Sequence, residues 1–171
     1  YEMSESDLII LWGTNAVSTQ VNVMHHISKA RKKRGARLIV IDPYENQSAI
    51  VADQYLCINP GTDGALALTI MNVLLRENKI DRNFLLEFTD YNDEVEKIIS
   101  QKNLTWGEQI TGIPAREIEK LAIEYAETER AFIRLGYGFS RHRNGAAAVH
   151  SVSCLPSITG KWLKNGGGAL L

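Results

Sequence analysis

Two apolar segments of strand length, separated by one stretch of helical pattern, constrain the fold of this chain more than any other feature. They are Asp7-Leu-Ile-Ile-Leu-Trp-Gly-Thr-Asn15 and Arg37-Leu-Ile-Val-Ile-Asp-Pro-Tyr44, and Val17 to Gly35 between them is predicted to form one helix. Parallel strands need such a crossover, so the pattern predicts a strand–helix–strand unit. Open α/β sheets bind ligands beyond the carboxyl ends of their strands, where nucleotide cofactors often lie. The first candidate residues therefore follow these two strands.

Composition narrows the class of protein. A length of 171 residues suits a single domain, here taken as residues 1–171, and 44% hydrophobic with 23% charged residues is typical of a globular protein. The net charge of −1 disfavours a nucleic-acid partner. No apolar run approaches the roughly 20 residues that span a bilayer, so we expect no membrane insertion by this segment. The chain starts without methionine and stops in a glycine-rich stretch, so it is expected to be a fragment of a larger enzyme.

The rest of the chain continues the alternation of strands and helices. A connecting stretch, Tyr44 to Ala52, leads to a third strand over Asp53 to Asn59, and a fourth strand covers Arg130 to Gly136. Helices are predicted over residues 17–35, 64–78, 81–88, 92–100, 115–129 and 144–159. The fold class is therefore α/β, a doubly wound, mainly parallel sheet with helices on both faces, similar to a Rossmann fold.

The turn Gly13-Thr14-Asn15 follows the first strand and precedes a helix, so its backbone amides and the helix dipole could meet a phosphate. The alternative is an ordinary tight turn in which Gly13 supplies an unusual backbone angle. The segment lacks the pattern G-x-G-x-x-G, which disfavours a nicotinamide or flavin cofactor.

Two further turns carry carboxylates. Asp42, followed by Pro43, ends the second strand, where a carboxylate commonly accepts hydrogen bonds from ribose; a turn aspartate before proline is the alternative. In the second turn, Gly61 precedes Thr62 and Asp63 at the start of a helix, and helix capping alone would explain both residue types. The carboxylate of Asp63 could instead pair with the N1–H and amino group of guanine, which present two donors side by side.

The last candidate turn, Gly136-Tyr-Gly138, follows the fourth strand, and its glycines permit close approach. The basic residues 141–143 that follow could meet anionic groups or form a solvated loop. The histidines are expected to lie on helix faces, His150 having no metal ligand at i+4, and the three tryptophans are expected to be packing residues. Cys57 and Cys154 are expected to be buried thiols. These patterns predict neither a catalytic constellation nor a metal site.

In this order, the segments resemble the molybdopterin oxidoreductases of the dimethyl-sulfoxide reductase superfamily, which includes formate dehydrogenases, nitrate reductases and polysulfide or thiosulfate reductases. The resemblance runs from about Asp7 to Leu170. Besides the segments above, it is carried by Ala52-Asp53, Pro60-Gly-Thr-Asp-Gly-Ala-Leu-Ala-Leu68, Ile110-Thr-Gly112, Gly136-Tyr-Gly138 and Leu155-Pro-Ser-Ile-Thr-Gly160. Tyr44 stands where relatives often have arginine, and Lys161 where they often have asparagine.

The resemblance implies an internal α/β domain that binds one molybdopterin guanine dinucleotide of a bis-cofactor carrying molybdenum or tungsten. It places Gly13 and Asn15 near the phosphates, Asp42 at the guanosine, Thr62 and Asp63 at the phosphate–guanosine part, and Gly136 to Gly138 towards the cofactor. The metal ligand and the iron–sulfur cluster are expected upstream, so the fragment itself should be inactive. Partners would be the remaining domains and electron-transfer subunits, in a cytoplasmic or periplasmic enzyme. The alternatives are a domain of a nicotinamide- or thiamine-dependent enzyme, or a scaffold with a degenerate site.

Overall fold

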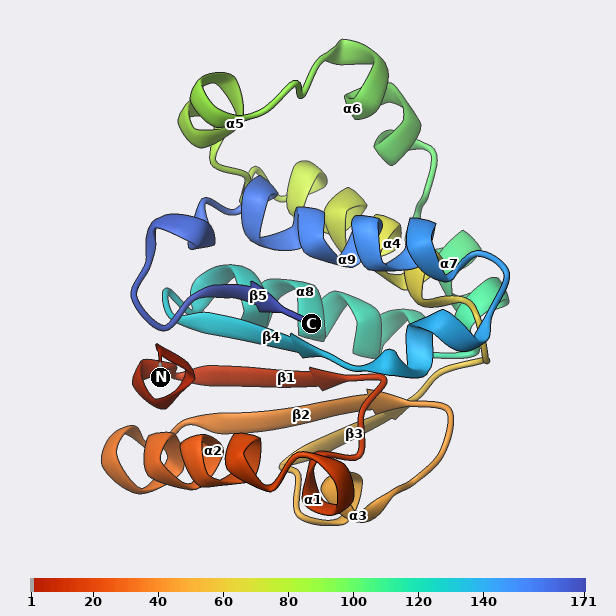
Figure 1. Ribbon diagram of the computed structural model, residues 1–171. Coiled ribbons are helices and arrows are strands. Elements are labelled where there is room, and N and C mark those ends of the chain that lie inside the picture. Colours follow the sequence, from red (N-terminus) through yellow and green to blue (C-terminus); the bar gives the residue numbers. More distant parts are fainter. Residues whose placement is uncertain (1) are drawn as a thin grey trace.

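The computed structural model describes residues 2–171. In this range five parallel strands form one sheet in the order β3-β2-β1-β4-β5 (Figure 1). They are β1 (Leu8–Trp12), β2 (Arg37–Asp42), β3 (Gln54–Cys57), β4 (Ala131–Leu135) and β5 (Gly168–Leu170). The chain builds the sheet outward from β1 through β3, then returns to add β4 and β5 on the other side. The order therefore reverses between β1 and β4, and such a switch point is where open α/β sheets bind ligands.

Helices cover both faces of the sheet, as the sequence predicts. On one face lie α1 (Ala16–Thr19), α2 (Val21–Arg34) and α3 (Gln47–Ile50), with the 3-10 turn η1 (Glu2–Glu5) beside α2. On the other face lie α4 (Asp63–Arg76), α8 (Ala115–Glu127) and α9 (Gly145–Ile158). Further out, α5 (Arg82–Phe88), α6 (Asp93–Ser100) and α7 (Leu104–Thr111) pack on α4 or α9 (Figure 1). The 3-10 turns η2 (Tyr137–Arg141) and η3 (Lys161–Leu163) flank α9.

The continuous apolar run of β1 reflects this two-sided cover. Alternate residues of a strand point to opposite faces. Leu8, Ile10 and Trp12 accordingly enter the core beneath α4, α8 and α9, while Ile9 and Leu11 enter the core beneath α2. All five residues are buried. A strand buried on both faces is apolar at every position, which is why the predicted β1, β2 and β4 agree with the structure.

The helix predicted over residues 17–35 is wrong in one respect, because it is divided at Gln20. Gln20 has φ −139° and separates the single turn α1 from α2. The hydroxyl of Thr19 donates to the carbonyl of Asn15 over 2.8 Å. Threonine hydroxyls that bond to nearby carbonyls weaken the regular helix, and this contact accompanies the break. The predicted end of the helix is confirmed, since Gly35 has the left-handed φ of +68°.

Three elements lie outside the pattern that the sequence predicts. The stretch expected to connect β2 and β3 contains α3, which begins at Asn46, whose side chain accepts from the amides of Ser48 and Ala49. The eight-residue helix α7 lies between α6 and α8, and β5 pairs with β4. The third strand is also shorter than expected, covering residues 54–57.

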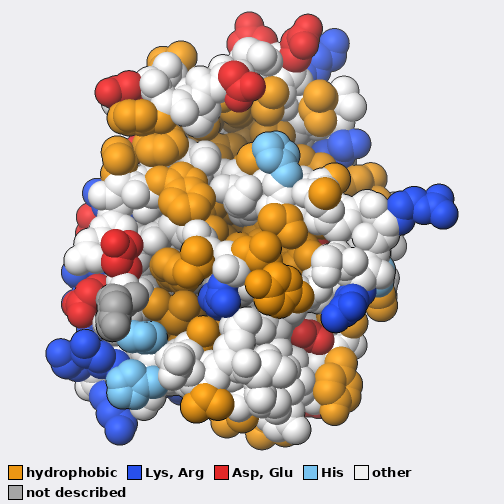
Figure 2. Space-filling model, in the orientation of Figure 1, with side chains coloured by type: hydrophobic (Ala, Val, Ile, Leu, Met, Phe, Trp, Pro, Cys, Tyr) orange, Lys and Arg blue, Asp and Glu red, His pale blue; other side chains and the backbone are white. Residues whose placement is uncertain are grey.

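The glycines at residues 166–168 are ordered and buried. The hydroxyl of Ser6 donates to the carbonyl of Gly166 over 2.7 Å, which fixes this segment beside η1. The predicted exposure of apolar side chains near the end of the chain is confirmed for Trp162, Leu163, Leu170 and Leu171, whereas Ile158 is buried. Hydrophobic side chains gather near the middle of the face shown in Figure 2, over the part of Figure 1 where β5 lies. None of the helices in residues 2–171 has the length and apolar character needed to cross a membrane.

Candidate functional site

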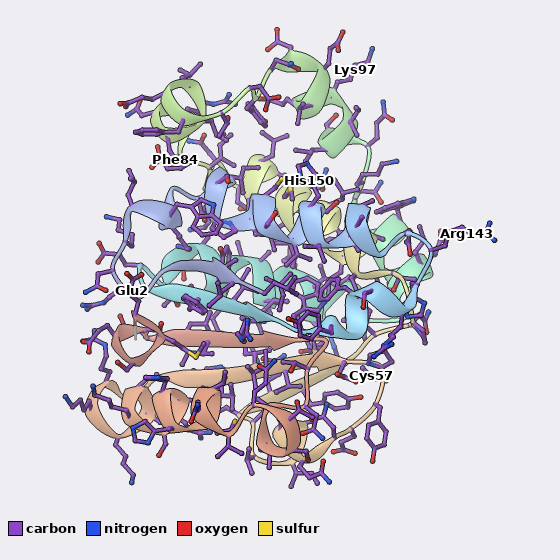
Figure 3. All side chains as sticks on the ribbon, viewed as in Figure 1. Glu2, Cys57, Phe84, Lys97, Arg143 and His150 are labelled. Atoms are coloured by element: carbon purple, nitrogen blue, oxygen red, sulfur yellow. The ribbon has the colours of Figure 1, made fainter. Side chains whose placement is uncertain are left out.

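The turns singled out in the sequence meet at the carboxyl edge of the sheet. Because Trp12 pairs in register with Ile41 and Leu135, the segments that follow β1, β2 and β4 begin side by side. Asp42 pairs with Cys57, which brings the end of β3 to the same edge. Figure 3 shows Cys57 and Arg143 at this end of the molecule, the end to which the strand arrows point.

The turns after β1 and β4 are in backbone contact at the switch point. Gly13 has φ +67°, and its carbonyl accepts a hydrogen bond from the amide of Gly138 over 3.2 Å. The amide of Gly136 donates to the carbonyl of Trp12 over 2.9 Å. A Cβ atom on Gly136 would overlap the carbonyl oxygen of Gly13 and Cβ of Thr14. The glycines therefore permit these two turns to approach one another closely.

These contacts determine which amides remain for a ligand. The amide of Gly13 donates to the carbonyl of Ile41 over 2.9 Å, so it is already engaged, like those of Gly136 and Gly138. The next two amides, those of Thr14 and Asn15, donate to no backbone carbonyl within residues 2–171. The side chain of Asn15 bonds to Gln47 and Ser48 of α3. Any phosphate at this turn would therefore meet the amides of Thr14 and Asn15 at a single helical turn, α1, rather than at a long helix.

Asp42 ends β2 as a half-buried carboxylate. Its Oδ1 accepts a hydrogen bond from the amide of Tyr44 over 3.0 Å, which is the turn contact expected before Pro43. Burial raises the pKa of Asp42; the Tyr44 amide partly offsets this, and the nearby charge of Asp63 raises it further. A carboxylate with two oxygens keeps acceptor capacity after one such bond. Asp42 is therefore a desolvated acceptor at the candidate site.

Asp63 is the more deeply buried of the two carboxylates, with an exposed fraction of 8%. Its Oδ1 accepts a hydrogen bond from the indole Nε1–H of Trp12 over 2.8 Å. Burial raises the pKa of Asp63, while the Trp12 hydrogen bond, its own backbone amide and the charge of His142 act in the opposite direction. The predicted role in helix capping is wrong for both candidate residues. Thr62 stands at the cap without a side-chain cap bond, and its hydroxyl donates to the carbonyl of Asn59.

Neither carboxylate is neutralised by a cation. In the part of the chain that the structure describes, no ion pair includes Asp42 or Asp63. Burying an unpaired carboxylate is unfavourable, and donors that bond to its ionised form compensate for the cost. This edge therefore fits a ligand that brings hydrogen-bond donors, such as ribose hydroxyls or the donor edge of guanine.

The turn after β3 is held against the segment that leads into α9. Asn144 donates from Nδ2 to the carbonyl of Gly61 over 2.8 Å. The ring of His142 lies against Gly61, where an added Cβ would be 3.2 Å from the ring atom Cγ. Arg141 and Arg143 are exposed in the same segment, and Figure 3 shows Arg143 projecting from the carboxyl edge. Two cationic side chains thus stand near the two carboxylates, where they could meet the phosphates of a nucleotide.

Three residues that build this site are not among those that the sequence pattern indicates. The pattern predicts only packing for Trp12; it is fully buried, and it also donates to Asp63. Phe139 packs beneath Gly13, and Asn144 fastens the turn at Gly61. The sequence signal for Trp12 is its place as the last residue of β1, immediately before Gly13.

The cysteines and histidines differ from two expectations. Cys57 is exposed and Cys154 half-buried, so the expected burial of both thiols is wrong. Cys57 is the last residue of an edge strand, and Cys154 lies on the outer side of α9. Cys154 is also at i+4 from His150, with 3.8 Å between Sγ and Nε2, so His150 does have a potential ligand at that spacing. No group of three or more metal-ligating side chains occurs within residues 2–171.

The main surface depressions lie away from this edge. One follows the outer face of α8 between Arg116 and Thr128, and another lies by Arg31 and Arg37 near the amino end of β2. The candidate site is therefore defined by unpaired carboxylates and converging turns rather than by an enclosed cavity.

Comparison with known proteins identifies the family. The family model for molybdopterin oxidoreductases matches residues 1–171. The chain belongs to the molybdopterin oxidoreductase family. It is 44% identical over 169 residues to the probable oxidoreductase YoaE of Bacillus subtilis, and this match covers 99% of the chain and 25% of that protein. It is 34% identical to the dimethyl sulfoxide reductase DmsA of Escherichia coli, a match that covers 97% of the chain and 23% of that protein.

A solved structure gives the same result for the fold. The acetylene hydratase of Pelobacter acetylenicus matches with a TM-score of 0.82 and 27% identity, covering 95% of this chain and 22% of that one. This chain spans about a quarter of the length of the curated relatives it matches. It is thus a molybdopterin oxidoreductase domain with the predicted α/β fold, and membership of this family implies a molybdenum cofactor.

Proposed function

We propose that the carboxyl edge of the sheet binds the guanine dinucleotide of one arm of a bis-molybdopterin cofactor. The observation that carries the proposal is the buried carboxylate of Asp63, which lacks a cationic partner in residues 2–171 and lies at the start of α4 beside the switch point. Asp42 stands at the neighbouring strand end and would accept hydrogen bonds from the ribose.

The chemistry of Asp63 favours guanine over other bases. Guanine presents N1–H and its amino group side by side, so both donors can reach one carboxylate. Each carboxylate oxygen accepts up to two hydrogen bonds, and Oδ1 therefore keeps capacity after its bond to Trp12. Cytosine has an acceptor where guanine has the N1–H donor, so it would oppose the carboxylate. The phosphates would meet the amides of Thr14 and Asn15 and the cationic residues Arg141 and Arg143.

In this proposal the domain holds the cofactor and leaves the reaction to the rest of the enzyme. When bound, the metal centre of the cofactor supplies the redox or atom-transfer chemistry. The relatives that share this domain carry different names, a dimethyl sulfoxide reductase, a formate dehydrogenase and a hydratase. Residues that select the substrate should accordingly lie outside the features common to this domain. The metal ligand and any iron–sulfur cluster would also lie outside these 171 residues, which alone should turn over no substrate.

The proposal is tested by cofactor occupancy in the full-length protein. Asp63→Asn replaces an acceptor oxygen with a donor amide, which would face the donors of guanine. Expressed with limiting cofactor, the variant should retain about tenfold less guanine per molecule of folded protein, since an opposed buried polar group costs about 1–3 kcal/mol. Guanine released by acid hydrolysis and molybdenum measured by mass spectrometry give the occupancy.

Asp93→Asn is the matched control, because Asp93 is likewise the first residue of a helix, α6, but is exposed and distant from the carboxyl edge. It should retain the wild-type guanine content. Wild-type occupancy in Asp63→Asn would contradict the proposed contact and would favour a domain with a degenerate site.

A further inference from the structure

A buried hydrogen bond joins the switch point of the sheet to the helix that carries Asp63. The indole of Trp12 projects from the last residue of β1, and Asp63 is the first residue of α4. Their side chains meet over 2.8 Å between Nε1 and Oδ1, across 51 residues of sequence. The orientation of the carboxylate is therefore determined by the central strand and not by α4 alone.

The indole ring is itself held in place. Trp12 has no exposed surface, and its ring packs on that of Phe139 at 6.3 Å between centroids and 45° between planes. Phe139 belongs to η2 and lies against Gly13, where an added Cβ would be 3.1 Å from Cε2. Close packing on these sides restricts the ring to one orientation. The Nε1–H donor is thus fixed at a definite place relative to β1 and β4.

A tryptophan suits this place because it offers one uncharged donor. Indole has a single N–H, whereas arginine presents a fork of donors that pairs with both oxygens of a carboxylate and neutralises its charge. The charged or titratable groups that act on Asp63 are His142 from the segment before α9 and Asp42 from β2. Trp12 consequently orients Asp63 while leaving its negative charge and its second oxygen in place.

We propose that Trp12 is the positioning residue for guanine recognition: its indole N–H holds Oδ1 of Asp63 and leaves Oδ2 as the acceptor for the base. This inference rests on the proposed function of Asp63. It adds a residue that touches no ligand and acts through the carboxylate that does.

A spectroscopic test needs no change at Trp12. In ¹H–¹⁵N spectra of the chain, the indole resonance of Trp12 should shift with pH along the titration of Asp63 and lose this shift in Asp63→Asn. The indole of Trp162 is an internal reference, because its Nε1–H donates to the hydroxyl of Ser157. A Trp12 resonance that does not titrate in the wild-type chain, or titrates equally in Asp63→Asn, would overturn the inference.

The functional test uses Trp12→Phe in the full-length protein, since phenylalanine keeps an aromatic ring and removes the donor. We expect about three- to tenfold lower guanine content under limiting cofactor, the effect of losing one buried hydrogen bond to a charged acceptor. The pKa of Asp63 in the variant should be higher than in the wild type, because a bond that favoured the ionised form is gone. Loss of packing alone would not produce that change specifically at Asp63.

The double variant Trp12→Phe/Asp63→Asn separates this inference from the proposed function. If Trp12 acts through Asp63, the double variant should match Asp63→Asn alone. Reduced guanine in Asp63→Asn with wild-type guanine in Trp12→Phe would overturn the positioning role and leave the proposed function standing. Wild-type guanine in Asp63→Asn would overturn both. Equal and additive losses in the two single variants would show that Trp12 acts through packing and would also overturn the inference.

Discussion

The two edges of the sheet treat their charged residues in opposite ways. At the amino edge, Asp7 accepts hydrogen bonds from Arg34 and Arg130 at 2.7–2.9 Å. The pairs Arg31–Asp53 and Arg37–Glu124, both at 2.8 Å, lie at the same edge. At the carboxyl edge, Asp42 and Asp63 form no ion pair within the described residues. The amino edge satisfies its charges internally, and the carboxyl edge leaves two carboxylates for a ligand.

The pKa shifts follow the same division. Burial alone would raise the pKa of Asp7, but the hydrogen bonds and charges of Arg34 and Arg130 outweigh it and lower the pKa. At Asp42 and Asp63 burial outweighs the available hydrogen bonds and raises the pKa. Asp7 therefore stabilises the fold in its ionised form, whereas the ionised forms of Asp42 and Asp63 cost stability until a ligand binds. Residues at the carboxyl edge are thus retained at the expense of stability, as expected of a binding site.

The largest effect should come from Gly136→Ala at the carboxyl edge, where a methyl group would overlap Gly13 and Thr14. Overpacking against backbone should lower the free energy of unfolding by about 3 kcal/mol. Gly35→Ala is the counterpart at the amino edge. Gly35 has φ +68°, but no heavy atom lies within 4 Å of the place that a Cβ would occupy, so only backbone strain of about 1 kcal/mol is expected. Urea denaturation of both variants tests whether the carboxyl turns depend on close backbone contact.

Lys161 is the exception at the amino edge, because it is a buried cation bonded to carbonyls instead of a carboxylate. Its Nζ donates to the carbonyls of Ala126 and Thr128 near the end of α8. Burial lowers the pKa of Lys161 from 10.5 to about 8. Between these values the unfolded chain binds more protons, so stability should rise from pH 8 to 10.5.

The measurement is the difference in unfolding free energy between wild type and Lys161→Met across this pH range. The wild type should gain about 2 kcal/mol relative to the variant, within the limit set by about 1.4 kcal/mol per unit of pKa. Parallel pH profiles for the two proteins would contradict the assigned burial of the charge.

Asp7→Asn should lower stability by about 1–2 kcal/mol near neutral pH, through weaker hydrogen bonds that solvent partly screens. Since the folded pKa of Asp7 is depressed below 3.8, its contribution is present above that pH and is lost as the pH falls through the folded value. The variant should therefore show a shallower loss of stability in acid than the wild type. Thermal unfolding between neutral and acidic pH provides the comparison, and an unchanged acid slope would show that the arginines do not stabilise the ionised form.

Asp63→Asn should have the smallest effect on the ligand-free chain and the opposite sign. Removing a buried charge should leave stability unchanged or raise it by about 0.5 kcal/mol near neutral pH. The folded pKa of Asp63 is raised above 3.8, so the wild type should recover this difference as the pH falls through the folded value. A loss of more than about 1.5 kcal/mol at neutral pH would indicate a structural carboxylate and would weaken the contrast between the edges.

Much of the fold is predictable because its central strands are buried on both faces. β1, β2 and β4 are continuous apolar runs, and such runs between helices predict a parallel sheet. The short elements α3 and β5 depend on contacts with segments distant in sequence, and local pattern does not predict them. The helix α7 has signals in the sequence at both ends, since Asn103 accepts from the amide of Trp106 and Gly112 ends the helix with φ +74°.

The site is predictable to the level of its edge but not of its contacts. Strand order brings Gly13, Asp42 and Gly136 together, which follows from topology once the strands are parallel. The bond between Trp12 and Asp63 depends on side-chain orientation across 51 residues, which no spacing rule provides. For the same reason the sequence suggests that the glycines approach a ligand, whereas in the structure their contacts are with one another.

The most direct test of the unpaired carboxyl edge is a ¹³C NMR titration of the aspartate carboxyl groups with and without guanosine monophosphate. We expect saturating nucleotide to lower the pKa of Asp63 and of Asp42, because donors on the ligand stabilise the ionised carboxylates. Asp7 at the amino edge should not change, and adenosine monophosphate should leave Asp63 unaffected. Unchanged pKa values at Asp42 and Asp63 with saturating guanosine monophosphate, or an equal shift of Asp63 with the adenine nucleotide, would contradict the assignment of this edge to guanine binding.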